Sequence, residues 1–209
     1  MKSPFSANDL ILFTGDSITD CDRERNNSGS LGSGFVGVIA RQLWMQFEKL
    51  DLVFRNTGIS GDRTCDLIER WGRDCIDLQP DWVSILIGVN NTWRRYDTGD
   101  PTEPAVFEAE TRQLLERVRD QTRARTILCS PFLVHTNPGI SAMREDLDPK
   151  IAVLHTLALE FDAIWVDFNT AFIEAEKKKA PECWAEDGVH PSAVGHCLMA
   201  KVWQETVCA

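Results

Sequence analysis

The chain has 209 residues and a formal net charge of −10 at neutral pH. This length predicts one domain, residues 1–209, with enough chain to bury a substantial core. The negative charge argues against sequence-independent nucleic-acid binding and against an anionic membrane surface, because both need basic residues on the protein. We therefore expect neither nucleic acid nor a membrane as a partner.

Two further features of the composition bear on location and cysteine chemistry. No apolar stretch approaches the roughly 20 residues of a membrane span, and residues 1–9 are polar, unlike a secretory signal. We therefore expect a cytoplasmic protein. The seven cysteines form no Cys-x-x-Cys pair, so we expect free thiols that are mostly buried.

Five apolar runs predict β-strands, at residues 9–14, 52–56, 82–87, 126–131 and 164–168. Several are continuously apolar, which is typical of strands buried on both faces. Apolar stripes with helical spacing lie between and after them, beginning at Phe35, Leu67, Val106, Ile151 and Val194. Strands that alternate with helices predict a three-layer α/β/α fold with a parallel sheet. Residues 20–33, 96–104 and 133–148 lack clear periodicity and are candidate rim loops around a site.

Polar segments follow the first three strands and precede the last helix. Ser17 ends the first strand, Gly58 to Asp62 follow the second, and Asn90 ends the third. Ligands of open α/β sheets bind beyond the carboxyl ends of the strands, so we expect these segments to meet at one edge.

Asp187 and His190 stand three residues apart, before Pro191, which we expect to begin the last helix. Alone, Asp187 would be interpreted as a helix N-cap and Ser17 as a turn residue. Together, a serine, a histidine that takes its proton and an aspartate that orients the histidine are the parts of nucleophilic acyl transfer.

The four segments resemble the four sequence blocks of the SGNH hydrolases, also called GDSL-type esterases. Those blocks correspond here to residues 15–20, 56–61, 87–90 and 187–191. Residues 82–97 and 189–196 are similar, more narrowly, to bacterial acetylxylan and acetyl-xylooligosaccharide esterases. The resemblance implies a flavodoxin-like, five-stranded parallel sheet of order 2-1-3-4-5, no cofactor, and a chain that can form a homo-oligomer.

The resemblance also implies roles for individual residues. Ser17 is expected to be the nucleophile, His190 the general base and acid, and Asp187 its orienting partner. The backbone N–H groups of Ser17 and Gly61 and the side-chain amide of Asn90 are the expected oxyanion hole, where glycine would let the backbone approach the substrate. The family usually has aspartate after this asparagine, whereas Asn91 stands here.

Four residues near these blocks are candidates for substrate binding: Asp16, Trp93, Arg94 and Trp184. The two tryptophans would wall an acyl pocket or stack on a sugar, and packing at the rim is an equal alternative. Five other tryptophans, Trp44, Trp71, Trp82, Trp165 and Trp203, fall on core stripes or strands, where packing is the preferred interpretation.

The remaining histidines and one cysteine predict no chemistry of their own. His196 is interpreted as a structural histidine, and His135 and His155 as surface or loop residues. The four histidines lack the spacing of a zinc site, so we expect no metal. Cys21 has acidic neighbours that disfavour a thiolate, so we interpret it as a bystander.

The triad residues therefore predict a serine esterase that removes short acyl groups, and the resemblance implies acetyl groups on xylooligosaccharides or related carbohydrates. The same chemistry on aryl, thio or lipid esters, or an acyltransferase, is the first alternative. A nucleotide-binding module would need a phosphate-cradling glycine loop, and Asp16 stands where the phosphate would sit. A non-catalytic sugar-binding module would not need Asp187 and His190 together.

Overall fold

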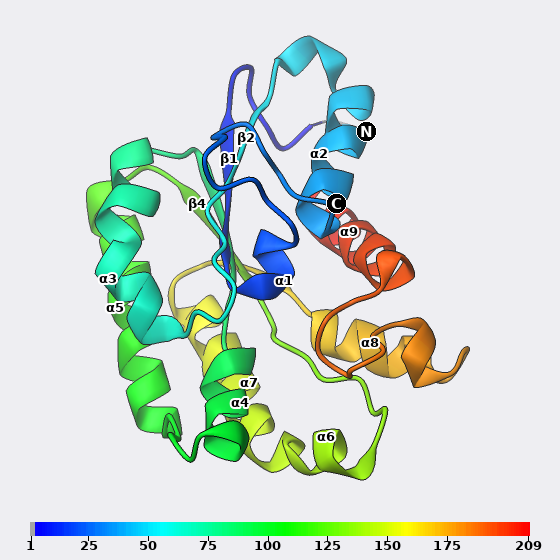
Figure 1. Ribbon diagram of the computed structural model, residues 1–209. Helices are drawn as coiled ribbons and strands as arrows, with labels where there is room; N and C mark the ends of the chain where they lie inside the picture. The colour runs from blue at the N-terminus through cyan, green and yellow to red at the C-terminus, as the bar shows by residue number, and fades with distance from the viewer. Residues whose placement is uncertain (1–2) are drawn as a thin grey trace.

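The computed structural model describes residues 3–209, and its five strands form one parallel sheet (Figure 1). The strands are β1 (Leu10–Gly15), β2 (Val53–Asn56), β3 (Trp82–Leu86), β4 (Arg125–Cys129) and β5 (Ile164–Val166). Their order, β2-β1-β3-β4-β5, is the predicted one. Each strand begins within one residue of its predicted start, because the residues that precede each apolar run lie outside the sheet.

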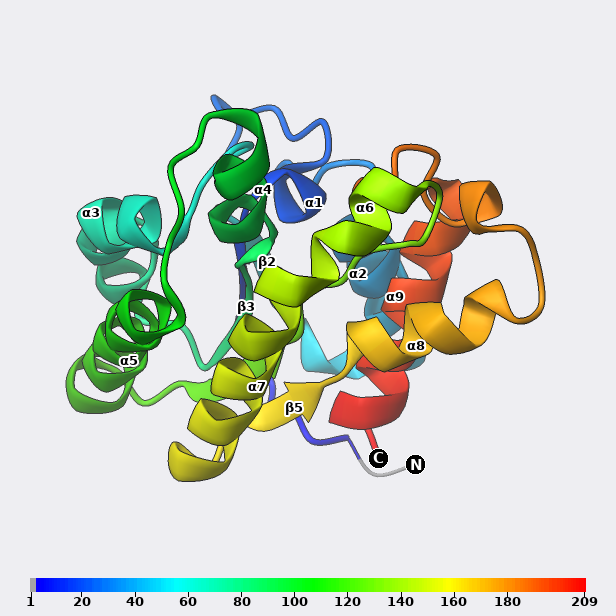
Figure 2. The same ribbon diagram turned by 90° about the horizontal axis from the view of Figure 1, so that it is seen from below.

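Helices cover both faces of this sheet and complete the predicted three layers (Figures 1 and 2). They are α1 (Ser17–Asp20), α2 (Phe35–Gln46), α3 (Thr64–Asp74), α4 (Val89–Asp97), α5 (Pro104–Gln121), α6 (Pro138–Ala142), α7 (Arg144–Glu160), α8 (Phe168–Glu176) and α9 (Ala193–Val207). Three single-turn 3₁₀ helices lie at Glu48–Leu50, Ile76–Leu78 and Pro181–Cys183. Helices α2, α8 and α9 pack on one face, and α3, α5 and α7 on the other.

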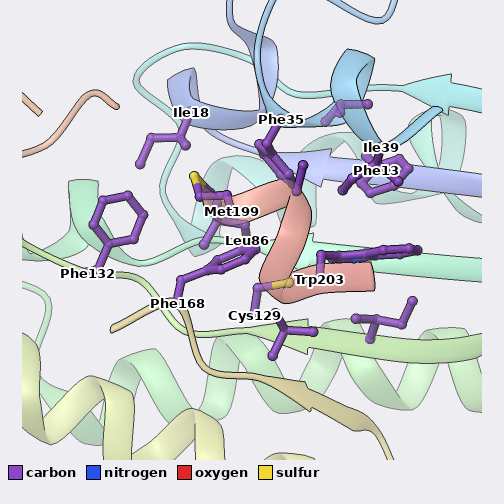
Figure 3. Close-up of a cluster of buried hydrophobic side chains, with 14 of the residues drawn as sticks. Phe13, Ile18, Phe35, Ile39, Leu86, Cys129, Phe132, Phe168, Met199 and Trp203 are labelled. Atoms are coloured by element: carbon purple, nitrogen blue, oxygen red, sulfur yellow. The ribbon is translucent and has the colours of Figure 1, made fainter. Parts of the chain in front are cut away.

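The core divides between these two faces. Figure 3 shows the cluster in which Phe13 and Leu86 from the sheet meet Phe35 of α2 and Trp203 of α9. Trp203 is fully buried, and its indole N–H donates to Ser84 Oγ at 3.0 Å. Because both faces of the central strands are covered, the carboxyl ends of the strands are left to carry a site.

Some sequence expectations about helices were wrong. Trp44, Val106 and Val194 are about half exposed, because each lies at the edge of its apolar stripe. Trp44 packs its ring edge-on against Phe54 and donates to the Leu52 carbonyl at 2.9 Å. Pro191 does not begin the last helix, since Ser192 is the N-cap of α9 and its Oγ accepts from Gly195 N.

All three expected rim loops overlap helices, the segment 20–33 only at Asp20, the last residue of α1. Residues of α4 and α5 occupy both ends of the segment 96–104, and α6 and the start of α7 lie within 133–148. Helix α6 has only five residues and is stabilised by Asn137, whose Oδ1 accepts from Ile140 N at 3.0 Å. A helix this short contains too few turns to produce a periodic pattern.

The cysteines are free, as predicted, but the expectation that most are buried was wrong. Cys75, Cys129 and Cys208 are buried, whereas Cys183 and Cys197 are exposed. No helix within residues 3–209 is long and apolar enough to span a membrane.

Candidate active site

Ser17 is held at the carboxyl edge of the sheet by a sharp turn between β1 and α1. Gly15 has φ +153°, and a Cβ there would lie 2.0 Å from the Leu86 carbonyl oxygen, so only glycine fits. Asp16 is the N-cap of α1, and its Oδ1 accepts from Ile18 N at 3.0 Å. The turn therefore places Ser17 at the first position of α1.

His190 lies in the loop that precedes α9. Gly188 has φ +84°, and a Cβ there would lie 2.8 Å from the carbonyl oxygen of Val134. Its own carbonyl accepts from Val134 N at 2.8 Å. Asp187 Oδ1 accepts from the backbone N–H groups of Val189 at 2.9 Å and His190 at 2.7 Å. These contacts turn both side chains, three residues apart, to the same side.

Ser17, His190 and Asp187 form a continuous hydrogen-bonded triad across 173 residues of sequence. Ser17 Oγ lies 2.9 Å from His190 Nε2, and His190 Nδ1 lies 2.6 Å from Asp187 Oδ2. Because the carboxylate accepts from Nδ1–H, the neutral ring leaves Nε2 as the acceptor for the serine hydroxyl. The arrangement suits removal of the serine proton by His190.

The electrostatics of Asp187 fit this arrangement. Burial acts to raise its pKa, but hydrogen bonds from the His190 ring and from the backbone N–H groups of His190 and Val189 outweigh burial and lower the pKa. Asp187 is therefore ionised at neutral pH and accepts from the His190 ring through Oδ2. Both side chains are accessible to solvent, at 56% exposed for His190 and 52% for Asp187.

The three expected oxyanion donors lie at the start of α1, in the loop that follows β2, and at the start of α4. Within residues 3–209, neither Gly61 N nor Ser17 N has an intramolecular acceptor. One N–H of the Asn90 amide donates to the Asp62 carbonyl at 3.0 Å, and the amide has a second. Gly61 has φ +91°, and its Cβ would meet only Arg94 Nη2, at 3.9 Å. Glycine is therefore required here by the backbone dihedral rather than by close approach.

The candidate substrate-binding residues differ in where they lie relative to the site. Asp16 is 1% exposed, so it lies beneath the site and not on a surface that a substrate could touch. Burial raises its pKa to about 7, and its Oδ2 has no hydrogen-bond partner within the described residues. Arg94 lies beside Gly61 and forms an ion pair with Asp97.

The two candidate tryptophans are partly buried. Trp93 lines a hollow of about 290 Å³ between α4 and α6, which also includes Tyr96, Asn137, Ile140 and Met143. Ile140 also contacts the turn at Gly188, so the hollow borders the histidine loop. Trp184 instead packs against the main core, and its carbonyl accepts from Ser192 N at 2.8 Å.

Buried polar residues that sequence reasoning missed support the loops of the site. Asp20 is 3% exposed, and its Oδ2 accepts from Ser60 N and Ser60 Oγ, both at 3.0 Å. Burial acts to raise the pKa of Asp20, but hydrogen bonds from Arg25 and Ser60 outweigh burial and lower the pKa. Arg70 on α3 binds Asp62 and two backbone carbonyls. Arg70 lies one position from Trp71 and three from Leu67. A charged residue within this apolar stripe is the sequence feature that could have identified it as buried.

Asn91, where the family usually has aspartate, is completely buried. Its Nδ2 donates to Thr64 Oγ1 at 2.9 Å and Thr102 Oγ1 at 3.2 Å, and its Oδ1 accepts from Thr64 N at 3.3 Å. The Thr64 hydroxyl in turn donates to Glu110. The amide thus ties the start of α4 to the start of α3, on either side of the expected hole.

The interpretation of His196 as structural is confirmed. Its Nδ1 accepts from Phe35 N at 3.1 Å, and burial lowers its pKa to about 4. His196 Nε2 lies 3.3 Å from Cys21 Sγ, and burial raises the pKa of the Cys21 thiol. No cluster of three or more metal-ligating side chains occurs within residues 3–209.

Comparison with known proteins agrees with this geometry. The GDSL-like Lipase/Acylhydrolase family matches residues 13–198. An acetylxylan esterase from Geobacillus stearothermophilus is 37% identical over 201 residues, covering 92% of this chain and 91% of the relative. Its crystal structure superposes with a TM-score of 0.90 at 35% identity, covering 97% and 95% of the two chains.

Two further sets of structures extend the comparison. A putative GDSL-like lipase from Parabacteroides merdae has a TM-score of 0.94 at 36% identity, covering 99% of both chains. The Geobacillus enzyme has also been solved as catalytic mutants in which a serine, an aspartate or a histidine is replaced by alanine. The chain therefore belongs to the GDSL-like lipase/acylhydrolase family, the SGNH hydrolases, and is an esterase related to acetylxylan esterase.

Proposed function

We propose that this protein hydrolyses acetyl esters of xylooligosaccharides or related carbohydrates through an acyl-enzyme on Ser17. The observation that carries the proposal is the hydrogen-bonded chain from Ser17 Oγ through His190 to Asp187. The relatives named as acetylxylan and acetyl-xylooligosaccharide esterases support the choice of acyl group and alcohol.

In the proposed reaction, Ser17 Oγ attacks the acetyl carbonyl while His190 Nε2 takes the hydroxyl proton. The resulting oxyanion is stabilised by Gly61 N–H, Ser17 N–H and the Asn90 amide. The bond to the sugar oxygen then breaks as His190 returns the proton to it. Water repeats the sequence on the acyl-enzyme, releasing acetate and restoring Ser17 and His190.

Solvent access favours hydrolysis over acyl transfer. A transferase must keep water from the acyl-enzyme, whereas the His190 side chain is 56% exposed. Water can therefore reach the ring that activates it. Aryl, thio and lipid esters remain alternatives of the same chemistry, and the substrate comparison below distinguishes them.

The hollow between α4 and α6 supports a carbohydrate as the leaving group. Trp93 and Tyr96 offer aromatic surface, and Asn137 and Asp97 offer polar groups at the edge. Sugar rings present apolar C–H faces and polar hydroxyls, so mixed lining of this kind suits them. The hollow borders the histidine loop through Ile140, and Tyr96 is 42% exposed. Figures 1 and 2 place α4 and α6 at the same end of the sheet as α1.

One experiment tests the substrate class directly. Acetate release from acetylated xylooligosaccharides is compared with hydrolysis of p-nitrophenyl acetate, butyrate and octanoate. We expect activity on the sugar and a fall in kcat/KM from acetyl to octanoyl. Burial alone would favour longer chains by ~0.8 kcal/mol per methylene, so the fall would report a closed acyl pocket. Preference for octanoate without sugar activity would replace the acetyl-sugar proposal by a lipid or thioester substrate.

Aromatic variants test the sugar site separately. Tyr96→Ala and Trp93→Ala should lower kcat/KM for the acetylated sugar while largely sparing p-nitrophenyl acetate. Trp44→Ala is the matched control, because Trp44 is about as exposed as Tyr96 but lies on α2. Equal losses of kcat/KM on both substrates would show that the hollow does not bind the sugar. Trp184→Ala should flatten the chain-length profile if its ring walls the acyl pocket.

A further inference from the structure

The side chain of Arg70 connects three of the segments that meet at the site. It is 8% exposed and lies on the second turn of α3, which packs beside the sheet (Figure 1). Nη2 donates to the Gly15 carbonyl at 3.1 Å, and Nη1 donates to the Thr57 carbonyl at 2.6 Å. Nε donates to Asp62 Oδ2 at 2.7 Å. One guanidinium thus holds the ends of two neighbouring strands and the loop that follows the second.

Two of these contacts lie within two residues of a proposed catalytic group. Gly15 begins the turn that delivers Ser17, and Asp62 directly follows Gly61. The Asp62 carbonyl also accepts from the Asn90 amide at 3.0 Å, so the third donor of the expected hole rests on the same loop. A displacement of Arg70 would therefore shift the positions of all three expected oxyanion donors.

The chemistry of the guanidinium explains why an arginine is suited to this position. It is planar and carries five N–H donors in a fixed fork, so it can bind groups in several directions at once. A lysine ammonium would supply one point of charge at the end of a flexible chain. Burial acts to raise the pKa of Asp62, and the charge of Arg70 opposes that effect.

We infer that Arg70 is a positioning residue for the oxyanion hole, which it aligns with the nucleophile by bracing Gly15, Thr57 and Asp62. Arg70 has no contact with Ser17, His190 or Asp187 among its hydrogen bonds, so it acts through the backbone that it holds. This inference rests on the proposed esterase function.

The test is Arg70→Lys, measured with p-nitrophenyl acetate and with a short alkylboronic acid, which forms a tetrahedral anionic adduct on a serine oxygen. We expect kcat to fall about 10- to 100-fold, which is part of the ~10²–10³ typical of losing one oxyanion donor, with KM changed less than about twofold. The affinity for the boronic acid should fall by a similar factor, because its adduct needs the same donors. A folded Arg70→Lys enzyme with kcat and boronic-acid affinity within about twofold of wild type would overturn the inference.

Arg73→Lys is the matched control. Arg73 lies on the same helix and binds Asp74, which is also a partner of Arg70, but its side chain is 75% exposed. We expect its kcat to stay within about twofold of wild type.

A second pair of variants decides the question if Arg70→Lys does not fold. Asp62→Asn removes the charged contact beside Gly61, whereas Asp74→Asn removes the other carboxylate that Arg70 binds, at 3.1 Å on its own helix. A drop in kcat of about fivefold or more in Asp62→Asn alone supports the inference, because a displaced donor should lose only part of the ~10²–10³ that a deleted donor loses. Equal kcat values in the two variants contradict it. Retained activity in Ser17→Ala would instead contradict the proposed function itself, so the two failures can be told apart.

Discussion

Ser17 and His190 share a hydrogen bond, yet the chain supports them in different ways. Around Ser17 and the expected oxyanion donors lie buried polar side chains: Asp16, Asp20, Arg70 and Asn91 are 1%, 3%, 8% and 0% exposed. Around His190, the partner side chain Asp187 is more than half exposed, and its carboxylate accepts from the backbone N–H groups of Val189 and His190.

This difference separates two requirements of the proposed chemistry. Donors that stabilise a developing oxyanion must stand in place before the reaction, and buried networks supply that rigidity at a cost in desolvation. A base that takes a proton from the attacking water when the acyl-enzyme is hydrolysed benefits from access to water. The nucleophile side should therefore couple activity to stability, whereas the histidine side should not.

The largest expected effect is on activity and comes from the triad itself. Ser17→Ala and His190→Ala should each lower kcat by at least about 10³-fold, because no acyl-enzyme can form efficiently. His190→Ala should leave the free energy of unfolding within about 0.5 kcal/mol of wild type, since the side chain is exposed. Steady-state kinetics and urea unfolding measure the two quantities. Retained activity in folded Ser17→Ala would disprove the triad.

Loss of an oxyanion donor should have the next largest effect. Asn90→Ala should lower kcat by about 10²–10³ with little change in KM. Asn90→Asp is the sharper variant, because it keeps the size of the side chain and removes the N–H donors. If Asn90→Asp remained within about tenfold of wild type, the amide would not be a donor to the reacting oxygen.

Asp16 predicts a pH-dependent effect on stability. Its folded pKa is about 7, above the ordinary value of 3.8, so its contribution to stability is fully present below about pH 4 and is lost as pH rises through 7. Asp16→Asn keeps an oxygen for Ile18 N and cannot ionise. The variant should match wild type most closely near pH 4 and become more stable by at most roughly 4 kcal/mol at pH 8.

The measurement is the free energy of unfolding of both proteins across that range of pH. A difference between them that does not grow from pH 4 to pH 8 would show that Asp16 is ionised throughout. In that case the buried carboxylate would have to be stabilised by groups that do not contact it in this structure.

The smallest expected effect concerns Asn91. Asn91→Asp removes the two N–H donors to Thr64 and Thr102, so the Thr64 hydroxyl must turn to the new carboxylate and leave Glu110. We expect a loss of about 1–3 kcal/mol in stability with activity retained. Glu110→Gln in the same chain should recover much of the loss, because an amide can donate to Thr64. If the single and double variants lost the same free energy of unfolding, Glu110 would not be part of this hydrogen-bond network.

Much of the fold was predictable because its signals are local. Apolar runs buried on both faces predicted the strands, and helical stripes between them predicted a parallel sheet. The short spacing of Asp187 and His190 and the position of Ser17 after a strand also predicted a triad, which the structure brings within hydrogen-bonding distance. The resemblance to known esterases added the strand order, which is confirmed.

Other properties were decided only when distant segments met. A periodic pattern shows which residues share a face, but it does not show what that face will contact. Asp16 could be at the surface or beneath it, and packing of the strands and helices placed it beneath. Arg70 binds Gly15, 55 residues away in sequence, and no local pattern encodes such a partner. The sequence by itself determined the elements and the chemically active side chains, whereas the tertiary structure decided which buried polar groups hold them in place.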